Sequence, residues 1–467
     1  MSAMNLTLHE LVGWLNNARL VGDGAVRCAR VHTDTRSLQA GDLFVALKGE
    51  RFDAASFLPE AAARGAVAVL CDDRAAAQLA ACGLPGVLVP DARLALGELA
   101  GQWRQRFSGP LIAVTGSNGK TTVTQMVGAM LRAWQGEAAF ATQGNLNNHI
   151  GVPITLLWMR ESHRAAVIEM GASARREIAR LAAIAAPGIA IITNAGPAHL
   201  GGFGGTLRDV AEAKGELFAG LPPGSIAVIN RDDPFYSYWR GLRDDVTYKS
   251  FGLSAEADYR AVDVQASGVQ GLRFRMLTPA GETAVDLPMA GGHNVRNALA
   301  AAAASLAAGA SLAAVRDGLG QMLNVAGRLR AEPGPAGSTI FDDSYNANPG
   351  SVAAAIHFLA GLDGQRWLVL GGMAELGPDH AALHREIGVL AAKSGIDRFY
   401  CVGELTRPAA EGFGAAAHWY ADVAELAEVL RPQMTADVHL LVKGSRSAGL
   451  ERLVRSVTGR TEEAGAH

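Results

Sequence analysis

The chain is short of cysteine and proline and has no excess of charge of either sign. Its 467 residues include four cysteines and 18 prolines. The cysteines stand singly, without a Cys-x-x-Cys pair, which excludes a disulfide framework or a zinc site and is typical of a reducing compartment. Lys and Arg number 42 against 45 Asp and Glu, giving a formal net charge of −3. Without a run of basic residues the sequence has no electrostatic footprint for nucleic acid or an anionic membrane, and we expect neither partner.

A long uninterrupted apolar run is also missing. The longest, Leu299 to Val315, is mostly alanine and contains Ser305, Gly309 and Ser311. Because alanine transfers weakly into lipid, we expect one buried helix over 295–315 and no membrane insertion. The N-terminal segment has charged and polar residues where a secretory signal would be apolar. We therefore expect a cytoplasmic protein, and one that works as a monomer.

The composition that remains is that of a globular enzyme-sized chain. Hydrophobic residues make up 49% and charged residues 19%, which excludes intrinsic disorder. The length suggests two to four domains. The 55 glycines follow no fixed period, so they indicate tight turns and places where backbone approaches a ligand.

Strand-like and helix-like segments alternate along the chain, which predicts an α/β fold. The central segments favour a doubly wound parallel sheet, whose functional residues lie at the carboxyl ends of its strands. An alternating segment at 259–276 favours antiparallel strands. We place domain boundaries near 106 and 326, giving domains 1–106, 107–326 and 327–467. The expected strands lie at 43–47, 66–70, 110–114, 165–169, 189–193, 226–229, 339–342, 366–370, 398–402 and 438–442.

A glycine-containing loop between the expected strand 110–114 and a helix-like segment predicts a phosphate-binding loop. Small residues let backbone N–H groups curl around a phosphate, and the helix N-terminus adds partial positive charge. Lys120 would reach the β- and γ-phosphates and the Thr121 hydroxyl would bind Mg²⁺. Val114 stands where the strict pattern has glycine, so the loop is a variant. Its residues are Thr115, Gly116, Ser117, Asn118, Gly119, Lys120, Thr121 and Thr122.

Three further residues are candidates for chemistry, each with a plainer interpretation beside it. Glu169 ends an apolar strand, so it is either a Mg²⁺ ligand or an exposed strand-end carboxylate. His199 follows a strand in a Gly/Pro loop; it is either solvated or placed at the same sheet edge as Lys120. Lys214 lies between acidic residues on a helix, and by composition alone it is a surface lysine.

Taken together, these motifs resemble the ATP-dependent Mur ligases of peptidoglycan synthesis, and among them the members that add D-alanyl-D-alanine. The resemblance covers almost the whole chain, and nine motifs in order are far more specific than any one. In chain order they are Asp34-Thr35-Arg36, 41–53, 115–122, 147–153, 194–202, 292–297, Gly327-Arg328, 342–349 and 442–446.

The resemblance implies three domains: an N-terminal α/β substrate domain for a uridine nucleotide, a central P-loop ATPase sheet, and a mobile C-terminal Rossmann-like domain. It implies that ATP phosphorylates the free carboxylate of UDP-N-acetylmuramoyl-tripeptide and that the amine of D-alanyl-D-alanine then attacks the acyl phosphate. An amine cannot displace oxide from a carboxylate at neutral pH, so the phosphate serves as the leaving group. Two Mg²⁺ ions and Lys120 would offset the like charges that meet there.

The resemblance also implies roles for individual residues. Lys120, Glu169, His199, Lys214 and Arg328 are the implied catalytic group. Thr121 and Glu169 hold one Mg²⁺ ion, and His199 with a carbamylated Lys214 serves the second. Arg328 meets the γ-phosphate on domain closure. The remaining nucleotide contacts are Asn294 and Asn297 on the base, which would otherwise be a helix cap and a surface amide, and Asp343 on the ribose. The implied substrate contacts are Thr35, Arg36, Lys48, Arg51, Asn147 and Asn148.

Two departures from the family pattern are visible. Ala54-Ala55 follow Asp53 where relatives often have Gly-His, and Gly371-Gly372-Met373 replaces a frequent Gly-Asp-Met, although Glu375 and His384 remain. Other members fit less well, because the diaminopimelate-adding Asp-Asn-Pro-Arg motif is absent and the folate-polyglutamylating relatives lack the first-domain Asp-Thr-Arg. A regulatory protein with an inactive site would be expected to have lost one of the implied catalytic residues, and all are present. A related ligase acting on another acid stays open.

Overall fold

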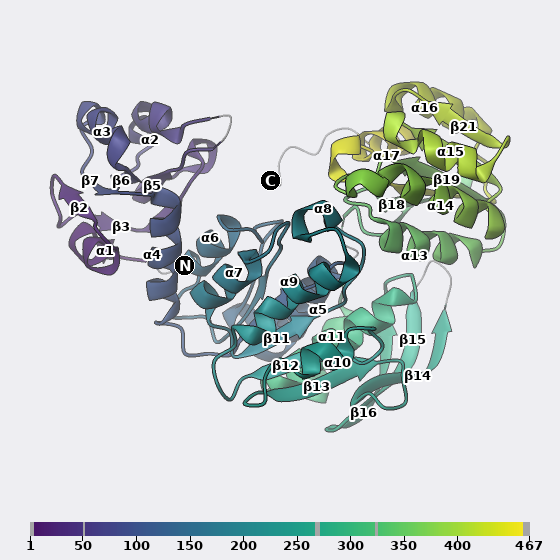
Figure 1. The fold of residues 1–467 in the computed structure, drawn as a ribbon, viewed down its shortest axis with the longest axis horizontal. Coiled ribbons are helices and arrows are strands. Elements are labelled where there is room, and N and C mark those ends of the chain that lie inside the picture. Colours follow the sequence, from purple (N-terminus) through teal and green to yellow (C-terminus); the bar gives the residue numbers. More distant parts are fainter. Residues whose placement is uncertain (1–3, 50–51, 267–270, 323–325, 461–467) are drawn as a thin grey trace.

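Three large β-sheets follow one another along the chain in the computed structural model, which describes residues 4–49, 52–266, 271–322 and 326–460. A small two-stranded sheet near the N-terminus pairs Leu6–Thr7 with Arg27–Cys28. In Figure 1 the N-terminal part (purple) and the C-terminal part (green to yellow) stand at opposite ends, with the central part (teal) between them. Helices flank each large sheet. The expected α/β fold class is confirmed.

The N-terminal sheet has five strands in the order β2-β7-β6-β5-β4. β2 runs antiparallel to β7, and the remaining neighbours are parallel. Both strands expected here are present, each shifted by one or two residues. The elements are β1 (Leu6–Thr7), α1 (Leu8–Trp14), β2 (Arg19–Val21), β3 (Arg27–Cys28), β4 (Arg30–His32), β5 (Asp42–Ala46), α2 (Leu58–Ala63), β6 (Ala68–Asp72), α3 (Ala76–Cys82), β7 (Gly86–Val89) and α4 (Ala92–Arg104).

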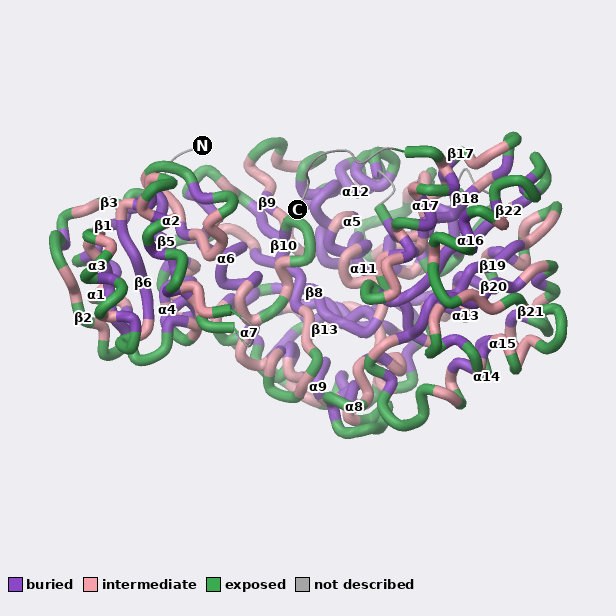
Figure 2. The backbone as a smooth tube through the Cα atoms, turned by 90° about the horizontal axis from the view of Figure 1, so that it is seen from above, coloured by how far each residue is buried: buried purple, intermediate pink, exposed green. Residues whose placement is uncertain are grey.

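The central sheet has nine strands in the order β16-β15-β14-β13-β12-β11-β8-β10-β9, with β8 parallel to both β10 and β11. β14, β15 and β16 pair antiparallel, as expected from the alternating segment. Figure 2 shows β8 and β10 buried within the molecule. The strands are β8 (Leu111–Thr115), β9 (Ala139–Ala141), β10 (Ala165–Glu169), β11 (Ile189–Ile192), β12 (Ile226–Asn230), β13 (Thr247–Gly252), β14 (Tyr259–Ala266), β15 (Leu272–Thr278) and β16 (Gly281–Leu287).

Helices cover both faces of this sheet, and one expectation about them is wrong. The single helix expected over 295–315 is two helices. Gly309 adopts a left-handed φ of 104°, and the Ser311 hydroxyl accepts a hydrogen bond from Ala314 N at 3.1 Å to start the second. The central helices are α5 (Lys120–Gln135), α6 (Gly151–Leu157), α7 (Glu177–Ala185), α8 (Leu200–Phe203), α9 (Leu207–Ala219), α10 (Tyr236–Arg240), α11 (His293–Ala307) and α12 (Leu312–Gly320).

The C-terminal sheet has six strands in the order β17-β18-β22-β19-β20-β21, parallel except for the edge strand β17. All four strands expected here are present. The elements are β17 (Arg330–Pro333), β18 (Thr339–Asp343), α13 (Pro349–Ala360), β19 (Gln365–Gly371), α14 (His380–Lys393), β20 (Arg398–Val402), α15 (Arg407–Phe413), β21 (Ala417–Tyr420), α16 (Val423–Leu430), β22 (Val438–Lys443) and α17 (Glu451–Thr458). The exact boundaries at 106 and 326 stay a prediction.

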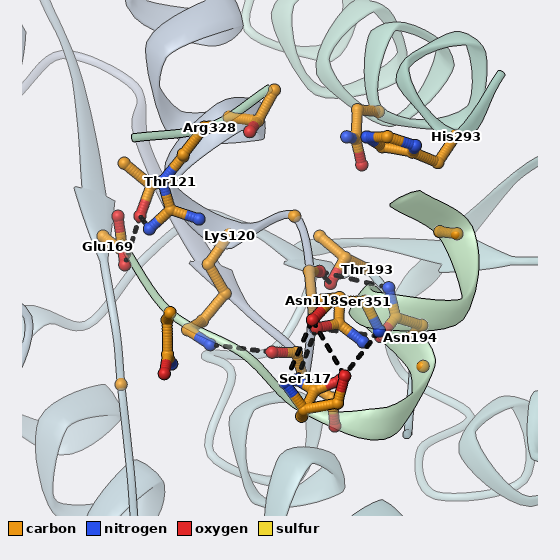
Figure 3. A pocket seen from close by; sticks show the side chains of 18 of the residues that line it. Ser117, Asn118, Lys120, Thr121, Glu169, Thr193, Asn194, His293, Arg328 and Ser351 are labelled. Carbon is orange, nitrogen blue, oxygen red and sulfur yellow. Dashed lines mark hydrogen bonds between the residues drawn. The ribbon is translucent and has the colours of Figure 1, made fainter. Parts of the chain in front are cut away.

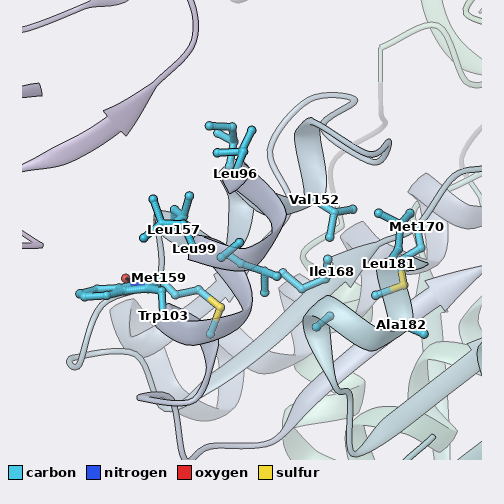
Figure 4. Close-up of a cluster of buried hydrophobic side chains, with 14 of the residues drawn as sticks. Leu96, Leu99, Trp103, Val152, Leu157, Met159, Ile168, Met170, Leu181 and Ala182 are labelled. Atoms are coloured by element: carbon cyan, nitrogen blue, oxygen red, sulfur yellow. Dashed lines mark hydrogen bonds between the residues drawn. The ribbon is translucent and has the colours of Figure 1, made fainter. Parts of the chain in front are cut away.

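Helix α4 joins the N-terminal and central parts through one continuous apolar core. Its buried Leu96, Leu99 and Trp103 pack against α6 and α7 of the central part (Figure 4). The Trp103 indole also donates a hydrogen bond to the carbonyl of Met159 at 3.0 Å. Fully buried leucine side chains each contribute about 2 kcal/mol relative to exposure, so α4 holds these two parts together. Over the described ranges, no helix has both the length and the apolar character to cross a membrane.

Candidate active site

The loop between β8 and α5 has the geometry of a phosphate-binding loop. Gly116 and Gly119 adopt φ values of 145° and 79°, a region that favours glycine. A Cβ on Gly116 would lie 1.9 Å from the Thr193 hydroxyl, so no other residue fits there. Helix α5 starts at Lys120 without a side-chain cap, which leaves first-turn N–H groups available to an anion.

The loop is braced by the residues that follow β11. Asn118 N donates to the side-chain oxygen of Asn194 at 3.0 Å, and Asn194 Nδ2 donates back to the Asn118 carbonyl at 3.1 Å. The Thr193 hydroxyl donates to that same carbonyl at 2.6 Å. Figure 3 shows Asn118, Thr193 and Asn194 close together beside Ser117. The bracing fixes the loop before any ligand arrives, which lowers the ordering cost of binding.

The Lys120 ammonium lies inside the loop. Its Nζ donates to the carbonyls of Gly116 at 2.8 Å and Ser117 at 3.2 Å. Burial lowers the pKa of Lys120; the Glu169 carboxylate opposes this effect and the Arg328 charge adds to it. A cation held this way is placed to meet phosphate oxygens.

Glu169, Thr121 and Arg328 form one hydrogen-bonded cluster (Figure 3). Glu169 Oε1 accepts hydrogen bonds from the Thr121 hydroxyl at 3.1 Å and Asn147 Nδ2 at 2.8 Å. Arg328 Nη2 donates to the Thr121 hydroxyl oxygen at 2.8 Å. Glu169 is 1% exposed, so the alternative of an exposed strand-end carboxylate is wrong. Arg328 comes from the start of the third sheet, so the cluster joins two parts of the molecule.

His199 faces the third part of the molecule. It has a left-handed φ of 55°, and its Nδ1 contacts a carboxylate oxygen of Glu375 across the junction. Burial lowers the pKa of His199; Glu375 opposes this and the charges of Lys120 and Lys214 add to it. Glu375 had no predicted role, because only the fold brings it to His199.

Lys214 is buried, and the expectation of a surface lysine is wrong. Its side chain on α9 is enclosed, with the residue 2% exposed, and Nζ lies 4.8 Å from the centre of the Phe203 ring. Its one hydrogen bond in the described ranges is a long one, 3.5 Å to the Ala172 carbonyl. Burial and the Lys120 charge lower the pKa of Lys214 to about 7, against the opposing effect of two glutamates. Its amine is therefore partly neutral at neutral pH.

Asn294 and Asn297 lie side by side at the start of α11, as expected. Both are buried, so neither is a surface amide. Asn294 Nδ2 donates to the Ala290 carbonyl at 2.7 Å, and Asn297 Nδ2 donates to Asn294 Oδ1 at 2.9 Å. A Cβ on Gly119 would lie 2.5 Å from Asn297 Oδ1. The phosphate loop and the asparagine pair are thus in direct contact.

Asp343, at the end of β18, is paired with a buried lysine that the sequence did not single out. Lys443 Nζ lies 2.7 Å from Asp343 Oδ2 and also donates to the Asn346 carbonyl at 3.0 Å. Asp343 Oδ1 accepts from Leu329 N at 3.2 Å. The pairing fixes the Asp343 carboxylate beside Arg328, because Leu329 and Arg328 are adjacent in the chain.

These groups surround one cavity of about 690 Å³. Its lining includes residues from the central and third parts of the chain, and most of the expected nucleotide and metal residues. Thr115, Gly116 and Lys214 are not part of that lining. The expected residues that line it are Ser117, Asn118, Gly119, Lys120, Thr121, Thr122, Asn147, Asn148, Glu169, His199, Asn294, Asn297, Arg328 and Asp343.

The expected substrate contacts in the N-terminal part do not line this cavity. Arg36 is exposed and pairs with Asp34 at 2.6 Å, and Lys48 is exposed. Thr35 is half-buried in a single 3₁₀ turn. Arg51 lies outside the described residues. Asn148 does line the cavity. Its Oδ1 accepts hydrogen bonds from Ile150 N at 3.0 Å and Gly151 N at 2.8 Å, so this oxygen caps the start of α6.

The donor set at Glu169 fits magnesium. Thr121 and Glu169 offer a hydroxyl and a carboxylate, the hard oxygen ligands that Mg²⁺ takes while keeping water and substrate phosphates. Among the described residues no group of three or more His, Cys, Asp or Glu side chains is arranged to hold a metal. The residues therefore suit an ion bound jointly with a nucleotide rather than one enclosed by protein ligands alone.

Comparison with known protein families identifies three matching regions. Residues 28–104 match the Mur ligase family catalytic domain, residues 114–305 the Mur ligase middle domain, and residues 327–446 the Mur ligase glutamate ligase domain.

Individual relatives match over nearly the full length. The UDP-N-acetylmuramoyl-tripeptide--D-alanyl-D-alanine ligase of Escherichia coli (strain K12) is 41% identical over 457 residues, covering 97% of this chain and 98% of that protein. A solved UDP-N-acetylmuramoylalanyl-D-glutamyl-2,6-diaminopimelate--D-alanyl-D-alanyl ligase from Acinetobacter baumannii superposes with a TM-score of 0.85 at 32% identity. The match covers 98% of this chain and 100% of that protein. MurF ligase from Thermotoga maritima, solved in complex with ADP, has a TM-score of 0.79 at 28% identity. That match covers 92% of this chain and 97% of that protein.

Proposed function

This chain belongs to the Mur ligase family, and we propose that it adds D-alanyl-D-alanine to UDP-N-acetylmuramoyl-tripeptide at the expense of ATP, in the synthesis of peptidoglycan precursors. The products are UDP-N-acetylmuramoyl-pentapeptide, ADP and phosphate. The observation that carries the proposal is the cluster of Lys120, Thr121, Glu169 and Arg328 at one cavity, in a chain that matches the E. coli ligase nearly end to end.

The reaction divides into two transfers. A carboxylate oxygen of the tripeptide forms a bond to the γ-phosphorus of ATP while the bond to the β-phosphate oxygen breaks and ADP leaves. The dipeptide amine then attacks the acyl carbon, phosphate leaves with the electron pair of the C–O bond, and the amine loses a proton. The first transfer brings a carboxylate to a polyphosphate, and the second develops negative charge on the acyl oxygen and the departing phosphate. Lys120 and Arg328 stabilise this negative charge.

In this proposal the nucleotide binds on the side of the cavity that the central part of the chain forms. The first-turn N–H groups of α5 and the Lys120 ammonium bind phosphates. Asn294 and Asn297 contact the base, and Asp343 contacts the ribose. That a relative is solved with ADP supports a nucleotide site.

Thr121 and Glu169 would hold one Mg²⁺ ion in this proposal, and His199 with Lys214 would serve a second. Bound there, the ions supply charge neutralisation to the phosphates. The buried amine of Lys214, with its pKa near 7, is nucleophilic toward CO₂ at neutral pH. Carbamylation converts a cation that would repel Mg²⁺ into an oxygen ligand, which explains why a lysine is buried here.

The tripeptide substrate spans from the N-terminal part to the cavity. We assign the uridine nucleotide to the side of Thr35, Arg36, Lys48 and Arg51, and Asn147 and Asn148 to the peptide end. Diaminopimelate is the proposed third residue, since the A. baumannii relative acts on a peptide that contains it. We also propose that the protein works as a monomer in the cytosol, where its four free cysteines stay reduced.

The test is phosphate release from ATP with Mg²⁺, UDP-N-acetylmuramoyl-tripeptide and D-alanyl-D-alanine, leaving out one component at a time. We expect release to require all of them and mass spectrometry to show the pentapeptide. Turnover with another acid or amine, and none with these, would assign the chain to a different ligase reaction. Nucleotide binding without turnover on any UDP-muramoyl substrate would indicate an inactive site.

A further inference from the structure

A second cavity, of about 610 Å³, adjoins the first and is rich in arginine. Arg93 on α4 reaches it from the N-terminal side, and the other lining residues belong to the central part. His149 and Glu177 line both cavities, so the two are neighbours. The full lining is Arg93, His149, Arg175, Arg176, Glu177, Ala179 and Arg180.

Two of these charged side chains already have partners within the protein. Arg175 donates through Nε to the Phe203 carbonyl at 2.8 Å and pairs through Nη2 with Asp209 and Glu212. The Glu177 carboxylate accepts hydrogen bonds from the backbone N–H groups of Ser173 at 2.8 Å and Ala174 at 3.2 Å. Glu177 is therefore held by the turn that precedes α7, and no arginine among the described residues pairs with it.

Three arginines keep donors for a ligand. In the part of the chain that the structure describes, the side chains of Arg176 and Arg180 make no hydrogen bond or ion pair. Arg93 donates Nη2 to the Lys48 carbonyl at 2.8 Å, which leaves its other N–H groups. The field of these cations reaches His149: burial and Arg93 lower its pKa, Arg180 adds to this, and Glu177 alone opposes it. The cavity thus has four arginines against one carboxylate, Glu177, and is positive apart from the side that it shares with the reaction site.

We infer that Arg93, Arg176 and Arg180 bind a non-reacting carboxylate of the UDP-linked peptide; this rests on the proposed function. The planar guanidinium fork matches a carboxylate in two parallel hydrogen bonds. A D-glutamyl-diaminopimelate peptide has two such carboxylates within two residues of the one that reacts, at about 3.5 Å of chain per residue. Along the substrate, the muramoyl sugar and the peptide separate the nucleotide diphosphate from the reacting carboxylate. A peptide carboxylate is therefore the group we expect at a cavity that shares His149 and Glu177 with the reaction site.

The experiment uses the full-length protein and four variants. Arg180→Gln and Arg176→Gln remove one guanidinium each, Arg180→Lys keeps the charge without the fork, and Arg431→Gln is the control on an exposed arginine of the third part. KM and kcat are measured with UDP-muramoyl tripeptides that end in diaminopimelate or in lysine. Thermal unfolding of each variant checks that it is folded.

We expect Arg180→Gln to raise KM for the diaminopimelate peptide about 10- to 100-fold, the range for lost hydrogen bonds to a charged group. Arg176→Gln raises this KM less, and the KM of Arg180→Lys falls between those of Arg180→Gln and the original protein. KM for ATP stays within about twofold in every variant. An equal rise for both peptides identifies the D-glutamyl carboxylate. A rise confined to the diaminopimelate peptide identifies the side-chain carboxylate and makes this cavity the determinant of third-residue choice.

Unchanged peptide KM values in folded Arg180→Gln and Arg176→Gln would overturn the inference. It would also be overturned if these variants weakened the binding of UDP-N-acetylmuramate, which has the diphosphate but no peptide, as much as they weakened the tripeptide. If the unmodified protein turned over neither tripeptide, the proposed function itself would have failed, which is a separate outcome.

Discussion

The two junctions between the parts of the molecule differ in chemistry: one is apolar and the other is polar. The N-terminal part joins the central part through leucines and a tryptophan of α4 in one continuous apolar core. The third part meets the central part through polar pairs: Arg328 with Thr121, Asn348 with Asn118 at 2.7 Å, and His199 with Glu375. The polar junction also lines the reaction cavity.

The difference teaches which junction is able to move. Burial of apolar surface is lost entirely when packed faces separate, so the α4 junction is stable as one arrangement. A polar pair exchanges its partner for water or a ligand at a net cost of about 1 kcal/mol. We therefore expect substitutions at the polar junction to change catalysis and leave stability nearly unchanged, and substitutions at the apolar junction to do the reverse.

Lys120→Ala, in the cavity that the polar junction lines, has the largest expected effect. Loss of the ammonium removes charge stabilisation from phosphoryl transfer, and kcat falls about 10³-fold or more. The unfolding temperature stays close to that of the unmodified protein. Steady-state kinetics and calorimetry measure the two, with Lys393→Ala, an exposed lysine of α14, as the control. Near-normal turnover by the folded variant would contradict the role given to Lys120.

Lys214→Ala is expected to lower kcat by about 10²- to 10³-fold and to recover part of it with a short-chain carboxylic acid that replaces the carbamate. In the unmodified protein the pKa of Lys214 lies near 7 instead of 10.5. The amine is protonated below this pKa and neutral above it, so at constant dissolved CO₂ turnover rises with pH through about 7. If every acid fails to restore activity and the pH profile is flat, Lys214 is not carbamylated.

Leu99→Ala tests the apolar junction. Leu99 is fully buried in the shared core, and the cavity left by its truncation lowers the free energy of unfolding by about 3 kcal/mol. Leu94→Ala, on the exposed face of the same helix, is the control and costs much less. Denaturant unfolding measures both. The comparison between the junctions would be contradicted if the fall in kcat of Leu99→Ala, converted to free energy, exceeded its loss in free energy of unfolding.

Asn348→Ser is the smallest expected effect. Asn348 Oδ1 caps α13 by accepting from Ser351 N at 2.9 Å, while Nδ2 reaches Asn118. Serine keeps the cap but is too short to reach Asn118, so kcat/KM for ATP falls about 3- to 10-fold at unchanged stability. Asn348→Ala loses the cap too and is less stable by about 1 kcal/mol. Equal stability of the two variants would show that the cap contributes nothing.

The local parts of the site could be predicted from sequence because each depends on neighbouring residues. A buried strand, a glycine turn and a helix start within a dozen positions determine the phosphate loop. The two errors about elements and burial arose where the local signal was weak. Alanine-rich sequence continues through Gly309, so the break between α11 and α12 was missed. Lys214 looks like a surface residue until α9 packs it against Phe203.

The contacts that join distant segments could not be predicted, because pairing across the chain leaves no local pattern. Arg328 and Thr121 lie 207 positions apart. Glu375 reaches His199 only when two sheets meet. The arginine cavity is a mixed case: Arg175, Arg176 and Arg180 are close in the sequence, and only the fold adds Arg93 from α4.

The close approach of Gly119 to Asn297 has a consequence for how this enzyme can change over time. A side chain at Gly119 would collide with the amide that we assign to the base, and a longer side chain at Asn297 would press on the turn that grips the phosphates. Base preference and triphosphate binding therefore depend on the same contact, so a substitution that changes one also changes the other. A new nucleotide specificity would require simultaneous replacements at Gly119, just before α5, and at Asn297 on α11, which makes the choice of ATP hard to alter by single mutations.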